Sequence, residues 1–209
     1  MPGKYNNRYR VDSARLQGFD YGQNGAYFIT ICTKNRMNYY GEIVVDNVET
    51  HKNASHKNAS KIIKETHVNA SLQPTPIGII AIEYWGKIPE HYPFVSLDKF
   101  IVMPNHLHGI LVISKETHIV ETHQYASLRE KPYKNEFGPQ SGNISAIVRA
   151  YKGSVKSFAT KNKIDFGWQS RFHDHIIRDN NELHRIRNYI VDNPDNWPCS
   201  RENSEGLYM

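Results

Sequence analysis

Runs of apolar residues along the first half of the chain predict a strand, a helix and a pair of strands. Residues 26–33 (AYFITICT) combine aromatic and β-branched side chains, which is typical of a strand. Residues 77–92 (IGIIAIEYWGKIPEHY) suit a helix that ends near its internal proline. Two more apolar runs, 97–103 and 108–114, flank a Pro-Asn turn, so we expect them to pair as a hairpin.

The second half of the chain predicts two amphipathic helices with a short strand between them. Residues 143–161 place apolar side chains at helical spacing, namely Ile144, Ile147, Val148, Tyr151, Val155 and Phe158. A strand-like piece over 168–178 leads to residues 179–182 (DNNE), which can cap a helix that is stopped by Pro194. The order of strand, helix, strand, strand, helix, strand and helix favours an α+β sandwich over a doubly wound parallel sheet.

Two polar, repetitive stretches interrupt this pattern. In 49–73 and 116–129 the phrase Glu-Thr-His, followed by Asn-Ala-Ser or Tyr-Ala-Ser, recurs, and no apolar period supports packing. We therefore expect two low-complexity repeat inserts that form loops on a single domain spanning residues 1–209. Their histidines are potential metal ligands, although polar repeats without a scaffold rarely hold a defined site. These histidines are His51, His56, His67, His118 and His123.

Composition narrows the class of protein further. The chain has 209 residues, with 26 Lys and Arg against 21 Asp and Glu, which gives a formal charge of +5. Its pI near 9.1 permits a polyanionic partner but does not require one. The longest aliphatic run, 77–82, is far shorter than the ~20 apolar residues of a membrane-spanning helix. Because the N-terminus carries no apolar segment and the two cysteines, Cys32 and Cys199, lie far apart, we expect a cytoplasmic protein without a disulfide framework.

The clearest candidate for chemistry is the His-Leu-His sequence after the Pro-Asn turn. Successive side chains of a strand alternate between its faces, so His106 and His108 point the same way while Leu107 faces the other layer. Two imidazoles about 7 Å apart on one strand can share a divalent cation. The alternative is that both are solvent-facing histidines at the start of a strand, since the spacing alone is a weak signal.

A second His-x-His sequence, at His173 and His175, is a weaker candidate. Its middle residue, Asp174, is charged and would not enter a core. We therefore expect these two histidines to be polar partners in a sheet or near the site.

The last predicted helix brings a phenol and an amide together. Leu183, Ile186 and Ile190 form its apolar stripe. Tyr189 lies to one side of that stripe, and Asn193, four residues on, lies beside it at the helix end. The alternative is that Tyr189 is only a boundary residue of an amphipathic helix and Asn193 only its terminator before proline.

Together, two imidazole nitrogens and one amide oxygen would form an open three-ligand site for Mg²⁺ or Mn²⁺, with room for a phosphate. A phenol with an ordinary pKa of about 10 is a poor nucleophile at neutral pH, so the cation would have to polarise the P–O bond. Attack by Tyr189 would then leave a 5′-phosphotyrosine and a free 3′-hydroxyl, which could reverse the step without ATP.

Two long phrases resemble a known family. FIVMPNHLHGILVI and, after it, WQSRFHDHIIRDNNELHRIRNYIVDNPDNW strongly resemble the REP-associated tyrosine transposases, single-tyrosine members of the HUH (His-hydrophobic-His) endonuclease superfamily. The match includes YFITICTKNR, YYGEI and AIVRAYKGSV, while the two repeat inserts fall outside it. The resemblance implies a ferredoxin-like (RRM-like) fold with a central antiparallel sheet, helices on both faces and the histidines on a middle strand.

The resemblance also implies roles for particular residues. His106, His108 and Asn193 would be the ligands of Mg²⁺ or Mn²⁺, and Tyr189 would be the nucleophile. Members of this family bind single-stranded or hairpin DNA from repetitive palindromes, cleave it and can rejoin it. The resemblance therefore predicts a metal-dependent single-stranded DNA endonuclease and strand transferase that acts as a monomer or a homodimer.

Basic and polar side chains outside these motifs are candidate DNA contacts. Three of them lie near one another on the helix predicted over 143–161, where the alternative is a solvated charged face. Three more bracket the strand that precedes the last helix. The six are Arg149, Lys152, Lys156, Gln169, Arg171 and Arg178.

Two other functions stay open at this point. One is a non-catalytic hairpin-DNA-binding protein derived from a transposase. The other is a metal-dependent hydrolase that uses the two histidines with water as the nucleophile, which would release a free 5′-phosphate. The intact set of histidines, tyrosine and asparagine favours the transesterase.

Overall fold

The computed structural model describes residues 4–5, 8–9, 19–46, 69–115 and 142–197. Its elements follow one another in this order: β1 (Lys4–Tyr5), β2 (Arg8–Tyr9), β3 (Gly25–Cys32), the 3-10 helix η1 (Lys34–Arg36), β4 (Gly41–Asp46), β5 (Asn69–Pro74), α1 (Pro76–Gly86), α2 (Ile88–His91), β6 (Val95–Met103), β7 (His106–Ile113), α3 (Ile144–Lys161), β8 (His173–Ile177) and α4 (Asn180–Asp192). The elements β1, β2, η1, β4 and β5 were not expected from the sequence. The others follow the expected order, with one helix divided in two.

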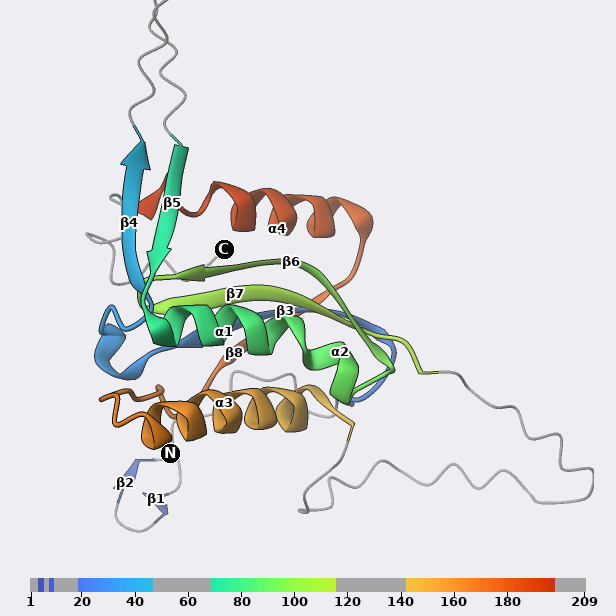
Figure 1. Ribbon diagram of the computed structural model, residues 1–209. Helices are drawn as coiled ribbons and strands as arrows, with labels where there is room; N and C mark the ends of the chain where they lie inside the picture. The colour runs from blue at the N-terminus through green and yellow to red at the C-terminus, as the bar shows by residue number, and fades with distance from the viewer. Residues whose placement is uncertain (1–3, 6–7, 10–18, 47–68, 116–141, 198–209) are drawn as a thin grey trace, which may run out of the picture.

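Four strands form a central antiparallel sheet in the order β6-β7-β3-β8. Along the chain, β3, α1, β6, β7, α3 and β8 follow the β-α-β-β-α-β order of a ferredoxin-like fold. Helices α1, α2 and α3 cover one face of this sheet, and α4 lies across the other (Figure 1). The expected α+β architecture, with a central antiparallel sheet flanked by helices, is therefore confirmed.

The strand register decides which side chains share a face of the sheet, because directly opposed residues point the same way. Thr30 of β3 lies opposite His108 of β7 and opposite His173 of β8. Cys32 of β3 lies opposite His106. Because α4 contacts His108, this whole row of side chains faces α4.

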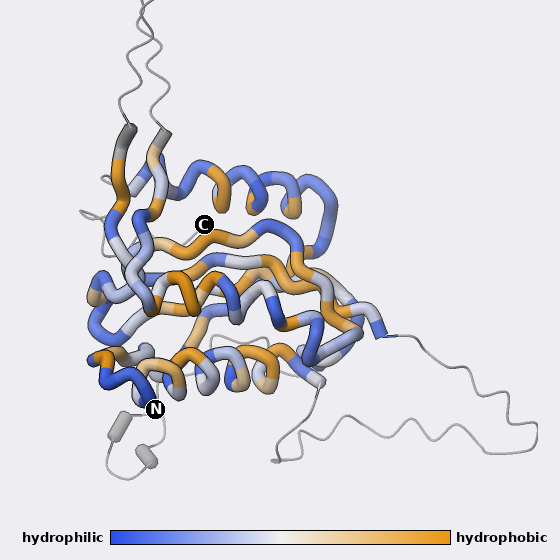
Figure 2. Tube along the Cα trace, viewed as in Figure 1, coloured by the Kyte–Doolittle hydropathy of each residue, from blue (hydrophilic) through white to orange (hydrophobic). Residues whose placement is uncertain are grey.

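The face covered by α1 and α3 carries the main core. Alternate residues of β3 and β7 are buried there, namely Tyr27, Ile29, Ile31, Leu107 and Leu111. Trp85 of α1 and Tyr151 of α3 meet edge to face, with ring centroids 5.2 Å apart, and the Tyr151 hydroxyl donates to the Ala81 carbonyl over 3.1 Å. Hydrophobic positions follow the strands and the sheet-facing sides of the helices (Figure 2). None of the helices in the described part of the chain has the length and apolar character needed to cross a membrane.

Gly109 lets the Trp85 ring pack directly on the middle of β7. A Cβ atom at this position would lie 2.5 Å from Trp85 Cζ2 and 3.1 Å from Phe100 Cβ. The neighbours would have to shift, so we expect Gly109→Ala to lower the free energy of unfolding by about 1–3 kcal/mol. Urea unfolding at equilibrium measures the change. Gly153→Ala is the control, because a Cβ there meets no atom within 4 Å, and an equal loss in both variants would contradict the prediction.

Two boundaries differ from those expected. The helix expected over 77–92 is divided into α1 and α2, because Pro89 has no N–H to donate and its ring clashes with the carbonyl four residues back. The strand expected over 108–114 begins at His106, so both histidines belong to β7. Only Pro104 and Asn105 remain for the turn between β6 and β7.

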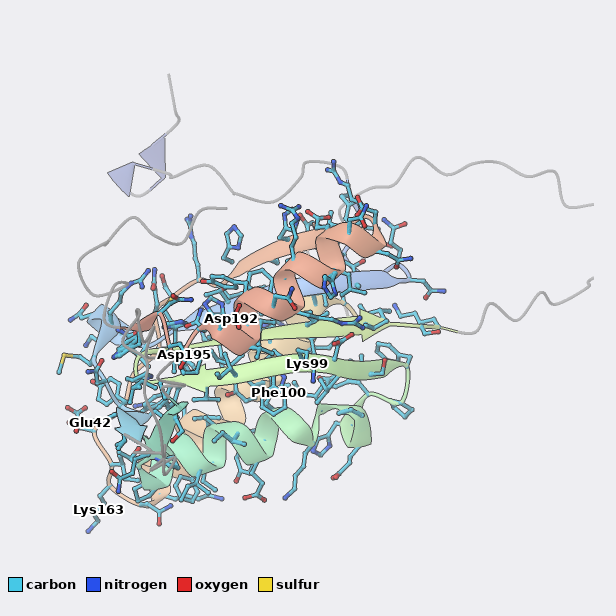
Figure 3. All side chains as sticks on the ribbon, turned by 90° about the horizontal axis from the view of Figure 1, so that it is seen from above. Glu42, Lys99, Phe100, Lys163, Asp192 and Asp195 are labelled. Carbon is cyan, nitrogen blue, oxygen red and sulfur yellow. The ribbon has the colours of Figure 1, made fainter. Side chains whose placement is uncertain are left out.

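β4 and β5 form a two-stranded antiparallel ribbon outside the central sheet. The prediction of a loop over 49–73 is wrong at the C-terminal end of this range, since Asn69–Pro74 forms β5. Its largely polar sequence has no strand pattern, and pairing with β4 along its whole length makes it a strand. The ribbon reaches the end of α4, where the Ala70 N–H donates to Asp195 Oδ1 over 3.3 Å; Figure 3 labels Asp195 beside the ribbon.

Lys115 closes the base of the second insert. Its ammonium group donates to the carbonyls of Gly22, at 2.5 Å, and Gly142, at 2.8 Å. The Lys115 backbone exchanges two further hydrogen bonds with the Asn24 side chain. The chain on both sides of this insert is therefore held by the host fold. The predicted insert 116–129 itself, and the first part of the other insert, lie outside the described residues.

Candidate active site

Strand β7 carries the two candidate metal ligands on one face. His106 and His108 are 6% and 1% exposed, and their ring centroids are 4.5 Å apart. This separation is shorter than the about 7 Å expected from strand spacing alone, so the rings incline toward one another. The Trp197 ring flanks His106, with centroids 6.0 Å apart. Two buried imidazoles thus lie side by side under α4.

The Asn105 amide fixes the tautomer of His106. Its Nδ2 group donates to the Arg36 carbonyl over 3.2 Å, which turns Oδ1 toward the imidazole. Oδ1 lies 2.7 Å from His106 Nδ1, and because an amide oxygen only accepts, Nδ1 carries the proton and donates. Nε2 of His106 therefore presents a lone pair, which is the form that binds a cation.

His108 has a partner on each ring nitrogen. Nδ1 lies 2.8 Å from the Thr30 hydroxyl oxygen, and Nε2 lies 3.2 Å from the Tyr189 hydroxyl oxygen. The Phe28 ring stacks on the imidazole with centroids 5.3 Å apart and meets the Tyr189 ring edge-on at 6.1 Å. Thr30 and Phe28 thus orient the imidazole, and Tyr189 lies at its other nitrogen.

Helix α4 is held firmly at its start and at its middle. The Asp179 side chain caps the first turn by accepting from the Glu182 N–H over 2.8 Å. An ion pair joins the helix to β6, with Arg187 Nε 3.0 Å from Asp98 Oδ1. These contacts set the position of the helix over the histidines.

Tyr189 and Asn193 lie on the same side of α4, as expected. Asn193 is the C-cap of the helix and is only 9% exposed. Its side chain hydrogen-bonds to His106 and to Tyr189. Of the expected apolar stripe only Ile190 is fully buried, and the other two residues are half-buried. The structure therefore brings together the two histidines, the tyrosine and the asparagine that the sequence singled out.

Burial keeps both imidazoles neutral. Desolvation, followed by the positive charge of Arg36, lowers the pKa of His106 to about 3, against the opposing effect of its hydrogen bond to Asn193. Desolvation, followed by the neighbouring His106, lowers the pKa of His108 well below its usual value. Burial raises the pKa of Tyr189, which Asn193 and Arg36 partly offset. Near neutral pH the imidazoles are therefore uncharged while the phenol keeps its proton.

The buried histidines predict that the fold loses stability in mild acid. A histidine whose folded-state pKa lies below the ordinary 6.5 takes up its proton on unfolding, so its contribution is complete above pH 6.5 and is lost as the pH falls toward 3. Each such histidine adds a slope of at most about 1.4 kcal/mol per pH unit. Urea unfolding between about pH 5 and pH 7, where most carboxylates stay ionised, measures this slope. His106→Gln should flatten it, and an unchanged slope would contradict the prediction.

The donors in this cluster fit a divalent cation. Two neutral imidazole nitrogens and one amide oxygen are the candidate ligands, and a protein group already orients each imidazole through Nδ1. In the part of the chain that the structure describes, no group of three or more His, Cys, Asp or Glu side chains could hold a metal ion. The donor set is thus uncharged. A cation bound to it would keep its full charge, which favours an anionic ligand such as phosphate.

The candidate DNA contacts on α3 are not gathered at this cluster. Arg149, Lys152 and Lys156 lie on the helix that covers the opposite face of the sheet from α4 (Figure 1). The ammonium groups of Lys152 and Lys156 donate to the carbonyls of Gln169, at 2.7 Å, and Phe166, at 2.6 Å. These lysines therefore tie the segment after α3 to the helix, and each ammonium keeps further donors for a phosphate.

The other candidate contacts flank β8. Arg171 and Arg178 are exposed on either side of this strand. Within the strand, His175 Nε2 lies 2.8 Å from Glu182 Oε1, and His173 lies opposite Thr30. The second His-x-His sequence thus supplies polar partners in the sheet, as expected. The DNA-binding role of all six residues stays a prediction.

Five residues of the site were not expected from the sequence: Phe28, Thr30, Arg36, Asn105 and Trp197. Asn105 carries a signal, because it directly precedes the first histidine. Phe28 and Thr30 follow from the alternation of β3 once its pairing with β7 is known. Arg36 and Trp197 carry no local signal, because only the folded chain brings them to the histidines.

The chain is similar in sequence to a known protein and in fold to a solved structure. No protein-family model matches the chain. A solved structure of "the REP associates tyrosine transposase bound to a REP hairpin" is 17% identical, with a TM-score of 0.49, covering 95% of this chain and 89% of that one. An uncharacterized protein of Haemophilus influenzae is 33% identical over 199 residues, which make up 94% of this chain and 96% of that protein. The chain therefore belongs to the same family as this Haemophilus influenzae protein.

Proposed function

We propose that the chain is a REP-associated tyrosine transposase: a metal-dependent, single-stranded DNA endonuclease and strand transferase that cleaves DNA at hairpin-forming repeats. The observation that carries the proposal is the Tyr189 hydroxyl, which lies 3.2 Å from His108 Nε2 beside a second neutral imidazole. A candidate nucleophile on α4 thus lies in contact with a candidate cation site on β7. The motifs that resemble this family support the same reading.

In the proposed reaction Tyr189 Oη attacks the phosphorus of a DNA phosphodiester. The bond between the tyrosine oxygen and phosphorus forms, the P–O3′ bond breaks, and the phenol proton ends on the departing 3′ oxygen. The products are a 5′-phosphotyrosine and a free 3′-hydroxyl. Because one phosphoester bond replaces another, a 3′-hydroxyl can attack the phosphotyrosine, rejoin the DNA and return the phenol without ATP.

The chain's own residues would hold the reacting groups in place. The two histidines and Asn193 would be the ligands of Mg²⁺ or Mn²⁺. When bound, the cation would neutralise charge on the scissile phosphate and stabilise the leaving 3′ oxygen. Asn105 and Thr30 orient the imidazoles, and Phe28 packs against the ring of Tyr189, which limits the positions of the phenol.

Covalent trapping tests this proposal. Labelled single-stranded hairpin oligonucleotides, drawn from palindromes of the host genome, are incubated with the protein and Mn²⁺ or Mg²⁺ and run on a denaturing gel. We expect a protein–DNA adduct that is absent in EDTA and that maps to Tyr189 by peptide mass spectrometry. His106→Ala should lower its yield. Lys87→Gln, on the opposite face of the sheet, should leave it unchanged.

Two other results would replace the proposal by a different function. Hairpin DNA that binds but forms no adduct with either metal would make the chain a non-catalytic hairpin-DNA-binding protein. Cleaved DNA with a free 5′-phosphate and no adduct would make it a hydrolase that uses water as the nucleophile.

A further inference from the structure

The turn after β3 holds two residues in a backbone conformation that L-amino acids rarely adopt. Asn35 has a φ of 53° and Arg36 a φ of 51°, both in the left-handed region. Two successive non-glycine residues persist there only where their surroundings impose the conformation. Residues with backbone strain of this kind are found most often at functional sites, which makes the Arg36 side chain a candidate for a role in the site.

Hydrogen bonds tie this turn to the turn that precedes the histidines. The Thr33 hydroxyl donates to the Met37 carbonyl over 2.7 Å and lies 2.9 Å from the Asn105 carbonyl oxygen. The Thr33 N–H donates to the same Asn105 carbonyl over 2.9 Å. In return, the Asn105 side chain donates to the Arg36 carbonyl over 3.2 Å. The two turns form one unit, so the backbone of Arg36 is fixed relative to His106.

Arg36 lies close enough to the candidate site for its charge to affect three of its side chains. It helps to lower the pKa of His106 and of His108, and it opposes the raised pKa of Tyr189. Its side chain is exposed, and among the described residues no carboxylate pairs with its guanidinium group. The guanidinium of Arg187 on α4, by contrast, is bound to a carboxylate. The backbone of Arg36 is thus held beside the site, and its exposed guanidinium group can bind an anion.

We propose that Arg36 binds the phosphate group that enters the site beside His108 and Tyr189, and that Asn105 positions it there. The inference rests on the proposed function for the identity of that phosphate, a DNA phosphodiester. A guanidinium presents its N–H donors as a fork that matches two phosphate oxygens, and the contact strengthens as charge builds on them during attack. The Asn105 side chain has two roles. Its Oδ1 orients His106 by a hydrogen bond to Nδ1, and its Nδ2 holds the Arg36 backbone by a hydrogen bond to the carbonyl.

The first test separates DNA binding from reaction. Arg36→Gln and Arg36→Lys are compared with the wild type and with Lys163→Gln, which removes an exposed charge after α3. Binding of a labelled single-stranded hairpin oligonucleotide in EDTA is measured across salt concentrations, and Arg36→Gln should reduce the slope of log K against log salt by about 0.7. With Mn²⁺, Arg36→Gln should slow adduct formation about a hundredfold or more, with partial recovery in Arg36→Lys. Lys163→Gln should match the wild type in both assays.

Arg36→Gly separates the strained backbone from the charged side chain. Glycine adopts a positive φ without steric cost, so the melting temperature should not fall in this variant. The rate of adduct formation should nevertheless fall as far as in Arg36→Gln. A slow but fully stable variant would exclude a merely structural role for Arg36.

Asn105→Asp tests the positioning role. Aspartate keeps an acceptor for His106 Nδ1 but has no N–H to donate to the Arg36 carbonyl. Titration with Mn²⁺ in the absence of DNA, followed by electron paramagnetic resonance, should give an affinity within about threefold of the wild type, whereas Asn105→Ala should weaken binding about tenfold or more. Adduct formation should be slow in both variants. Wild-type rates in Asn105→Asp would overturn the positioning role.

The outcomes distinguish this inference from the proposed function. If Arg36→Gln binds DNA with an unchanged salt slope and reacts within about twofold of the wild type, the inference is overturned and the proposed function stands. If the wild type forms no adduct, the proposed function fails. In that case the dependence of DNA binding on salt concentration in Arg36→Gln is the measurement that shows whether Arg36 binds phosphate.

Discussion

The Tyr189→Phe variant is expected to form no covalent adduct with DNA, with a rate at least about a thousandfold below that of the wild type. The change removes only the hydroxyl that would attack phosphorus. The ring keeps its neighbours, since its centroid lies 5.2 Å from that of His108 and 6.1 Å from that of Phe28. DNA affinity should therefore be retained. A time course of adduct formation with Mn²⁺ on a denaturing gel measures the effect.

Tyr84→Phe is the matched control for this experiment. Tyr84 lies on α1, which covers the face of the sheet opposite α4, so its hydroxyl is remote from the histidines. This variant should form the adduct at the wild-type rate. Full adduct formation by Tyr189→Phe would assign the nucleophile to another side chain, and DNA cleavage without an adduct in that variant would favour water.

Trp85→Ala is expected to cause the largest loss of stability, about 3–5 kcal/mol in the free energy of unfolding. Trp85 is fully buried and packs between Tyr151 and Phe100, with ring centroids 5.2 Å and 6.3 Å away. Removing the indole loses its apolar contacts and leaves a cavity that the surrounding elements can only partly fill. Equilibrium unfolding in urea, followed by far-UV circular dichroism, gives the change in free energy.

Ile79→Ala on the same helix is the control for Trp85→Ala. Ile79 is 53% exposed, so its truncation removes little buried surface and should change the free energy of unfolding by no more than about 0.5 kcal/mol. Alanine favours the helix more than either residue that it replaces, so an equal loss of stability in the two variants would contradict core packing as the cause.

The sequence predicted the elements that bury one face against another layer. β3, the β6–β7 hairpin and α3 were found because burial imposes a period of two residues on strands and of about 3.6 on helices. The same periods put His106 and His108 on one face and Asn193 beside Tyr189. Each of these pairs lies within or at the end of one element, so spacing along the chain was enough.

The parts that were not predicted depend on contacts between distant segments. β5 becomes a strand only through its pairing with β4. Arg36 is held near His106 because the Thr33 side chain bonds to the backbone of Asn105, 72 positions away. The basic residues of α3 share a surface that helical spacing predicts, but the face of the sheet that α3 covers follows from the ferredoxin-like connection. The spacing of apolar residues within α3 does not show which face of the sheet the helix covers.

Both inserts leave the fold at places where the fold itself keeps the chain ends together. β4 and β5 remain paired up to Asp46 and Asn69, and Lys115 bonds directly to Gly142. The entropy cost of closing a loop grows only slowly with its length, so segments of very different length can join the same ends at similar stability. These two positions are therefore suitable attachment points for foreign sequence. A fluorescent protein or an affinity peptide inserted there would allow the molecule to be followed on DNA without repacking its core.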